Sequence, residues 1–207
     1  MQAITPTKKL TAMDIYGALN YTYAQNSFIK VSNVYLYNWE SDFIVVKSSN
    51  HVYEFEIKTS RSDFYADFKK KDKHDVLSKG FYNSKYNPDK DVVGKRPNKF
   101  YYVCPEGMIN KAEVPEYAGL LYVVPSAGEG HYRTIKVKEA KKIHSELFCD
   151  WKLLSLRLYA RSNDNFSTAI NAVRSQKIYY DELYRLKNNC NIPDEIKKEI
   201  SLTLHHY

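Results

Sequence analysis

The sequence predicts an α/β protein, in which a mixed β-sheet is flanked by helices and followed by a helical tail. Three observations support this prediction. Before residue 138, short apolar and β-prone runs alternate with turn residues, as in strands. Two stretches among these runs have the four-residue apolar spacing of helices. From residue 138 onward the pattern is helical.

The length and composition set the domain organisation that we expect. A chain of 207 residues suits one domain with an appendage, and a hydrophobic fraction of 43% is enough for a core. We predict a core over residues 1–161 and a helical extension over residues 162–207. The extension has three possible roles that the sequence leaves open: covering the sheet, forming a homodimer, or binding a partner protein.

The amino-terminal part of the core predicts a helix and a strand. Residues 11–26 are expected to be helical, with Thr11 as the N-cap, because Ile15, Leu19 and Tyr23 recur every four residues. Residues 33–39 are aromatic and β-prone, which predicts a short strand.

A hairpin follows, with strands over residues 43–46 and 51–58 and a turn of two serines and an asparagine at 48–50. In the second strand, side chains alternate between the two faces, so four residues, three of them charged, share one face and three apolar or aromatic residues share the other. The first set is Val52, Glu54, Glu56 and Lys58, and the second is Tyr53, Phe55 and Ile57. We therefore expect an aromatic face in the core and a polar face on a cleft.

The remaining elements are predicted in order. A capping box at residues 60–63 begins a lysine-rich helix that ends near residue 80, with Phe64, Phe68 and Val76 inward and its lysines outward. Residues 82–99 predict a long loop. Strands are expected at 99–104, 119–124 and 132–137. Helices are expected at 138–147, 150–161 and 166–189, and after Pro193.

Most of the net charge of +7 lies in one segment. Between Lys69 and Lys99 there are nine lysines and one arginine against four aspartates. Clustered lysine is typical of proteins that bind a polyanion, because phosphate neutralisation dominates non-specific affinity for nucleic acid. The alternative is a solvated helix face followed by a charged loop. The residues expected to contact DNA are Lys69, Lys70, Lys71, Lys73, Lys79, Lys95 and Arg96.

One acid-x-lysine triplet has the setting of a catalytic site. The chain contains five such triplets, but only Glu56-Ile57-Lys58 lies in a predicted strand and follows a strand that begins with an acid, Asp42. Hydrolysis of a phosphodiester requires an activated water and relief of charge on the phosphate, and Mg²⁺ can supply both. Asp42 and Glu56 would provide carboxylate ligands, with the carbonyl of Ile57 as a possible third. Lys58 would stabilise developing charge near the attacking water.

The alternative is an exposed hairpin edge that carries glutamate and lysine for solubility. Glu54 shares the face of Glu56 and is a second-rank ligand, or else a surface cross-strand partner. Asp63 and Asp67 lie four apart on the following helix. Capping and the helix dipole explain these two acids better than the alternative, which is a direct role in the site. Ser60 is better explained as a helix cap than as a phosphate contact.

The residues from Asp42 to His74 carry a resemblance. The pattern DFIVV followed by YEFEIKTSRSDFYADFKKKDKH resembles the active-site region of the PD-(D/E)XK, or restriction-endonuclease-like, nuclease superfamily. The strand-end pattern K-x-S-x-x-D-F-x-x-D is similar to that of the MmcB-like DNA-repair group. The resemblance covers roughly residues 30–160. It implies an αβββαβ core, with Asp42, Glu56 and Lys58 at the catalytic positions. The position before Asp42 departs from the pattern, since Ser41 stands there instead of proline.

The function expected from the sequence is metal-dependent hydrolysis of DNA, in repair, recombination or the processing of phage and mobile-element DNA. Mg²⁺ is the expected cofactor, and Mn²⁺ is expected to substitute. The alternatives are a non-catalytic DNA-binding module of the same fold that docks a repair or phage complex, and an RNA-acting enzyme, which no RNA-reading motif supports. The sequence has no apolar stretch long enough to span a bilayer, so a cytoplasmic location is expected.

Overall fold

The computed structural model describes residues 9–25, 27–79, 96–126, 130–148, 150–188 and 193–205. Lys95 and most of the loop predicted at 82–99 lie outside the described residues. The chain divides into two compact units, Met1–Arg157 and Leu158–Tyr207.

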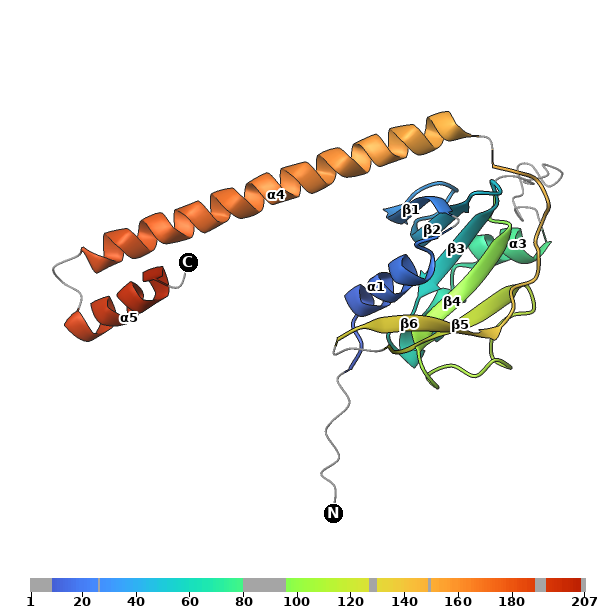
Figure 1. The fold of residues 1–207 in the computed structure, drawn as a ribbon, viewed down its shortest axis with the longest axis horizontal. Helices are drawn as coiled ribbons and strands as arrows, with labels where there is room; N and C mark the ends of the chain where they lie inside the picture. Colours follow the sequence, from blue (N-terminus) through green and yellow to red (C-terminus); the bar gives the residue numbers. More distant parts are fainter. Residues whose placement is uncertain are drawn as a thin grey trace, which may run out of the picture. The chain divides into compact units, whose positions relative to one another are not determined.

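The first unit is built on a six-stranded mixed sheet, in which the strands lie side by side in chain order (Figure 1). The strands are β1 Ser27–Val34, β2 Ser41–Lys47, β3 Val52–Ile57, β4 Lys99–Pro105, β5 Ala118–Pro125 and β6 Tyr132–Lys138. The pairs β1–β2, β2–β3 and β5–β6 are antiparallel, whereas β3, β4 and β5 run parallel. The molecule therefore has an open α/β fold, with helices flanking a mixed sheet.

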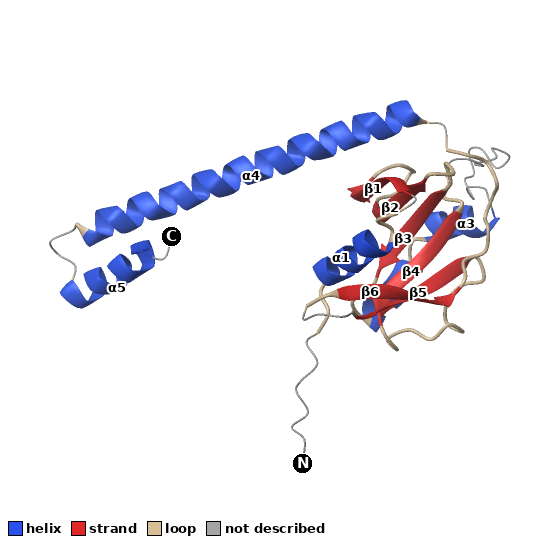
Figure 2. Cartoon of the chain, in the orientation of Figure 1, coloured by secondary structure: helices blue, strands red, loops and turns tan. Residues whose placement is uncertain are grey.

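Helices cover both faces of this sheet (Figure 2). Helix α1 (Ala12–Thr22) packs its Ile15 and Leu19 against one face, where Phe55 of β3 is also buried. Helices α2 (Arg61–Asp67) and α3 (Lys71–Lys79) cover the opposite face, where Phe64 and Leu77 contact aromatic residues of β4. Each large apolar side chain buried in this way stabilises the fold by ~1.5–3 kcal/mol.

Several predicted elements are confirmed. Thr11 caps α1, and its side chain forms a reciprocal capping box with Asp14. The hairpin of β2 and β3 is present, and Asn50 in its turn adopts a left-handed backbone conformation with φ of 59°. The strands predicted near 99, 119 and 132 are β4, β5 and β6, and Ser60 caps α2.

The prediction of a strand at 33–39 is wrong. The strand lies earlier, at β1, because Ser27–Val34 pairs antiparallel with β2 and the pairing ends where Val34 meets Ser41. Residues 36–39 form bends instead. These bends direct Trp39 toward β3, where its indole N–H donates a hydrogen bond to Glu54.

The prediction of one continuous lysine-rich helix is also wrong, because the helix is interrupted at residues 68–70. The amides of Lys69 and Lys70 close a tight turn onto the carbonyls of Ala66 and Asp67. The expected outward lysine face holds only in part, since Lys73 on α3 is buried. The expected burial of Phe64 and Val76 is confirmed.

Residues 138–147 do not form the predicted helix. After β6 ends at Lys138, residues 139–148 are neither helical nor β-structured. Their backbone groups bond to distant segments: the amide of Ile143 donates to the carbonyl of Asn98, and the amide of Phe148 donates to the carbonyl of Asn50. The Asn98 amide also donates to carbonyls of this segment. Tertiary hydrogen bonds thus replace the local ones that a helix would supply.

The carboxyl-terminal part of the chain is helical, as predicted. Helix α4 (Trp151–Lys187) is continuous through residues 162–165, where the sequence had predicted a break, because a polar run lowers helix propensity only slightly. Helix α5 (Asp194–His205) begins after Pro193, and Ile200 on it is buried. The division between the two units falls within α4. Among the described residues, no helix combines the length and apolar character needed to cross a membrane.

Candidate functional site

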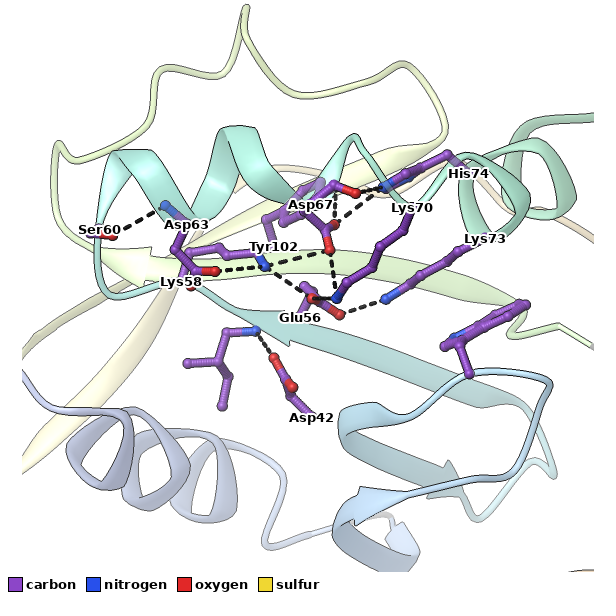
Figure 3. A network of polar contacts seen from close by, with 12 residues as sticks. Asp42, Glu56, Lys58, Ser60, Asp63, Asp67, Lys70, Lys73, His74 and Tyr102 are labelled. Carbon is purple, nitrogen blue, oxygen red and sulfur yellow. Dashed lines mark hydrogen bonds and ion pairs between the residues drawn. The ribbon is translucent and has the colours of Figure 1, made fainter.

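Asp42 and Glu56 lie opposite each other on adjacent strands (Figure 3). The antiparallel register pairs Phe43 with Phe55, so the next positions along the strands face each other. Opposed residues of this kind have their Cβ atoms roughly 5 Å apart. The amide of Ile57 donates to Oδ2 of Asp42 over 2.8 Å and holds that carboxylate at the end of β3. The two acids therefore share one corner of the sheet.

The polar face of β3 is buried, which corrects the expectation that it lines an open cleft. Glu54, Glu56 and Lys58 are 0%, 2% and 3% exposed. Helices α2 and α3 lie over this face, and in the described part of the chain a cavity opens at the end of the strand, beside Glu56 and Lys58. Glu54 is therefore not a surface cross-strand partner.

Lys73 compensates the charge of both strand acids from the interior. Its Nζ lies 2.5 Å from Oε2 of Glu56 and 3.3 Å from Oε1 of Glu54. Trp39 donates its indole N–H to the same Glu54 oxygen over 2.8 Å. Burial tends to lower the pKa of Lys73, but the two glutamates outweigh it and raise that pKa above its usual range. Lys73 is thus a buried internal cation, not the surface DNA contact expected from the sequence.

Lys58 is enclosed by three carboxylates. Its Nζ lies 3.0 Å from Oε1 of Glu56, 3.5 Å from Oδ1 of Asp67 and 3.6 Å from Oδ1 of Asp63. Only 4% of its side chain is exposed. Two of these partners, Asp63 and Asp67, come from α2, so the helix following the hairpin fixes the lysine that ends it.

Asp67 is the most heavily constrained acid of the network. It ends α2, so the expectation that the dipole at a helix amino terminus stabilises it is wrong. Tyr102 donates its hydroxyl to Oδ2 over 2.9 Å, and Nε2 of His74 lies 3.3 Å from the same oxygen. Burial would raise the pKa of Asp67, but His74 and Lys73 outweigh it and hold that pKa well below its usual range. Asp67 therefore carries a full negative charge inside the fold.

A cavity of about 270 Å³ opens at this corner of the sheet. Its lining includes Asp42, Glu56, Ile57, Lys58, Asp63 and Lys70. Lys70 reaches the site from the turn between α2 and α3, and its Nζ lies 3.0 Å from Asp67 and 3.4 Å from Glu56 (Figure 3). The structure thus brings all three predicted catalytic residues to one opening.

The pKa of Asp42 lies above the usual range of an aspartate. Burial raises its pKa to about 6, and the negative charge of Glu56 adds to the effect, whereas the amide of Ile57 and the charges of Lys58 and Lys73 oppose it. The strand register places the two carboxylates opposite each other, which is why the charge of Glu56 contributes to this rise. Neutral Asp42 is favoured below this pKa, and a cation between the two acids would favour the ionised form.

The donor set of this corner fits a divalent cation. Within the described residues, no three His, Cys, Asp or Glu side chains form a ready metal-binding group. Mg²⁺, however, is commonly held by one or two carboxylates while it keeps several waters. The network joins three lysines, Lys58, Lys70 and Lys73, to four carboxylates, those of Glu54, Glu56, Asp63 and Asp67. Adding Asp42 leaves an excess of two negative charges, which one Mg²⁺ would neutralise.

The other basic residues expected to bind DNA lie in two places: Lys69 and Lys71 are next to Lys70, whereas Lys79 and Arg96 line a separate cavity at the far end of α3. Lys69 and Lys71 are exposed beside Lys70, and all three line a second cavity of about 540 Å³ together with Trp39. Lys79 is exposed at the end of α3 and pairs with Asp75 at 2.7 Å. Arg96 donates to the carbonyl of Val76.

Comparisons with known proteins assign no family to this chain. No protein-family model matches it, and no curated protein matches it. One solved structure, a protein of unknown function from Silicibacter pomeroyi, matches with a TM-score of 0.47 and 13% identity, over 79% of this chain and 90% of that one.

Three residues of the network were not predicted from the sequence as partners of the site acids. Trp39, Tyr102 and His74 each bond to an acid of the site from a separate part of the chain. His74 lies between Asp67 and the hydroxyl of Tyr117. No local pattern signals these partners, because each contact depends on how the strands and helices pack.

Proposed function

We propose that this protein is a metal-dependent nuclease that hydrolyses phosphodiester bonds of DNA. The observation that carries the proposal is the convergence of Asp42, Glu56 and Lys58 on one open cavity at the end of β3. Two neighbouring carboxylates can hold a divalent metal that activates water, and an adjacent ammonium group can stabilise the charge that develops on a phosphate diester.

In this proposal Asp42 and Glu56 hold a Mg²⁺ ion, with Mn²⁺ as a substitute and the carbonyl of Ile57 as a possible further ligand. The ion would supply Lewis-acid polarisation of the phosphate. The chain's own contribution is to fix the acids: the amide of Ile57 orients Asp42, and Lys73 binds Oε2 of Glu56. Lys58, which lines the same cavity, places positive charge where negative charge develops during hydrolysis.

The order of elements supports a restriction-endonuclease-like core. From α1 to β4 the chain runs helix, three strands, helices, strand, as the resemblance of the active-site sequence implies. The exposed lysines of the α2–α3 region lie beside the candidate site, where a DNA backbone entering the cavity would pass. Phosphate contacts of this kind supply affinity without reading sequence.

One observation favours a non-catalytic DNA-binding module as the second candidate. Both oxygens of Glu56 are already paired, Oε1 with Lys58 and Oε2 with Lys73. A Glu56 carboxylate whose two oxygens are paired with lysines of the chain can be stable without a metal. The two candidates share the DNA-binding surface and differ in whether a metal binds and cleavage follows.

The deciding experiment measures cleavage of plasmid and single-stranded DNA with Mg²⁺ or Mn²⁺, together with metal binding by isothermal titration calorimetry. Wild type is compared with Asp42→Asn, which removes a ligand without breaking a buried ion pair. The matched control is Glu195→Gln, which neutralises an exposed acid in a look-alike triplet on α5.

We expect wild type and Glu195→Gln to cleave, and Asp42→Asn to lose metal binding and at least ~100-fold in rate, as a lost charge-stabilising group does. A wild type that binds DNA but neither binds metal nor cleaves would establish the non-catalytic module. Normal cleavage by Asp42→Asn would mean that the site has been placed wrongly.

A further inference from the structure

The three lysines that surround Glu56 differ in their freedom to move. Lys73 has 3% and Lys58 has 4% of its side chain exposed, and each ammonium group lies among buried carboxylates. Lys70 has 56% of its side chain exposed. Moving either buried ammonium away would leave an unpaired buried charge, which is costly. Lys70 can leave Glu56 and Asp67 at a lower cost, because its own side chain is exposed and both acids keep buried partners: Lys58 and Lys73 on Glu56, and Lys58 on Asp67.

The oxygens of Glu56 are divided among these lysines. Lys73 binds Oε2 from the interior, whereas Lys58 and Lys70 both lie near Oε1, at 3.0 and 3.4 Å. A metal ion that uses Glu56 from the cavity must approach the oxygen that Lys70 faces. Because like charges repel, such an ion displaces the lysine that is free to move.

A displaced Lys70 can reach a second cavity next to the first. It lines the cavity of Asp42 and Glu56, and it also lines the cavity formed by Lys69, Lys71 and Trp39. Lys70 lies on the turn between the two helices, and its long flexible stem lets its ammonium group reach different partners. A DNA phosphate at the shared rim of the two cavities is an anion within its range.

We propose that Lys70 exchanges partners, pairing with Glu56 and Asp67 in the free protein and with a DNA phosphate once a divalent metal occupies Glu56. This inference rests on the proposed function. It makes Lys70 the group that touches the phosphate, while Lys58 stays at the base of the cavity. It also couples the two ligands: metal binding releases the lysine that DNA uses, so each ligand strengthens the binding of the other.

The test measures this coupling without relying on cleavage. Mn²⁺ affinity is measured by electron paramagnetic resonance. Affinity for a short fluorescein-labelled DNA duplex is measured by fluorescence anisotropy, with Ca²⁺ and with EDTA. The proteins are wild type, Lys70→Ala, Lys70→Arg and the control Lys71→Ala, which removes an exposed lysine of the same surface. Circular dichroism and urea unfolding check that every variant is folded.

In wild type, Ca²⁺ is expected to tighten DNA binding by about fivefold, the most that an exposed ion pair typically supplies. Lys70→Ala should bind Mn²⁺ more tightly, because a competing cation is gone, and should lose the Ca²⁺-dependent gain in DNA affinity. Lys70→Arg should retain the coupling. Lys71→Ala should weaken DNA binding equally with and without Ca²⁺ and leave Mn²⁺ affinity unchanged.

Failure of this inference is distinguishable from failure of the proposed function. If wild type binds Mn²⁺ and cleaves DNA but Lys70→Ala behaves like Lys71→Ala, the partner exchange is wrong and the nuclease proposal stands. If wild type binds no divalent ion, both proposals are wrong.

Discussion

Lys73 on α3 donates to the carboxylate of Glu56 on β3 over 2.5 Å, and both side chains are buried. This pair joins the helix layer to the strand that carries the candidate site. It also determines which oxygen of Glu56 faces the interior, so the helix layer orients the candidate metal ligand.

Lys73→Met should destabilise the protein strongly. Methionine fills the space of the lysine stem, but Glu54 and Glu56 would lose their buried cation, and breaking a buried pair in this way costs about 3–5 kcal/mol. The measurement is the free energy of unfolding in urea at pH 7. Lys71→Met, on the exposed first residue of α3, should change it by less than about 0.5 kcal/mol. Equal effects of the two variants would show that Lys73 is not the internal counter-ion.

The raised pKa of Asp42 predicts that the free energy of unfolding depends on pH. The pKa of this carboxyl is raised to about 6 in the folded protein, so its contribution to stability is fully present below about pH 4, where the carboxyl is protonated in both the folded and the unfolded state. This contribution is lost as the pH rises through 6. Asp42→Asn avoids the loss. It should therefore be more stable than wild type at pH 8, by up to about 3 kcal/mol, and similar near pH 4. Urea unfolding at both values tests this, and a constant difference across the range would contradict the raised pKa.

Asp67 should show the opposite dependence on pH. Its pKa is held low in the fold, so its stabilising contribution is present above about pH 4 and is lost as the pH falls further. Asp67→Asn should cost about 2 kcal/mol at pH 7, because a buried charged acceptor loses its ion pairs, and the cost should shrink in acid. The control is Asp63→Asn: its side chain is half-exposed, and it pairs with the same Lys58. A deficit for Asp67→Asn that persists unchanged at low pH would argue for a packing effect instead.

Gly119 on β5 lets the ring of Tyr101 and the backbone of Ala140 lie closer to the strand than any side chain at this position would permit. A Cβ atom there would collide with the ring of Tyr101 and lie 2.7 Å from the backbone nitrogen of Ala140. Gly119→Ala should therefore destabilise the fold by roughly 1–3 kcal/mol, as overpacking does. Gly17→Ala is the matched control, since α1 leaves open space at that position and alanine favours helix by about 1 kcal/mol. Thermal unfolding of the two variants should shift in opposite directions.

Much of the fold could be predicted from local patterns. The hairpin follows from the alternation along β3 and from the turn at Asn50, and α1 and α2 begin at Thr11 and Ser60, whose side chains cap them. These features depend on neighbours a few residues apart. The helix predicted at 138–147 failed because its backbone groups bond to Asn98 and Asn50, which no local pattern reveals.

Local sequence patterns were enough to predict the hairpin, the shared face of Glu54, Glu56 and Lys58, and the lysine-rich segment beside them. The burial of this face, the inward position of Lys73 and the exposure of Lys70 became clear from the packed fold alone. A charge pattern fixes the spacing of ionisable groups along the chain, whereas their pairing and burial depend on which elements pack together. Here the break between α2 and α3 sets one lysine against Glu56 from the interior and another at the rim of the cavity.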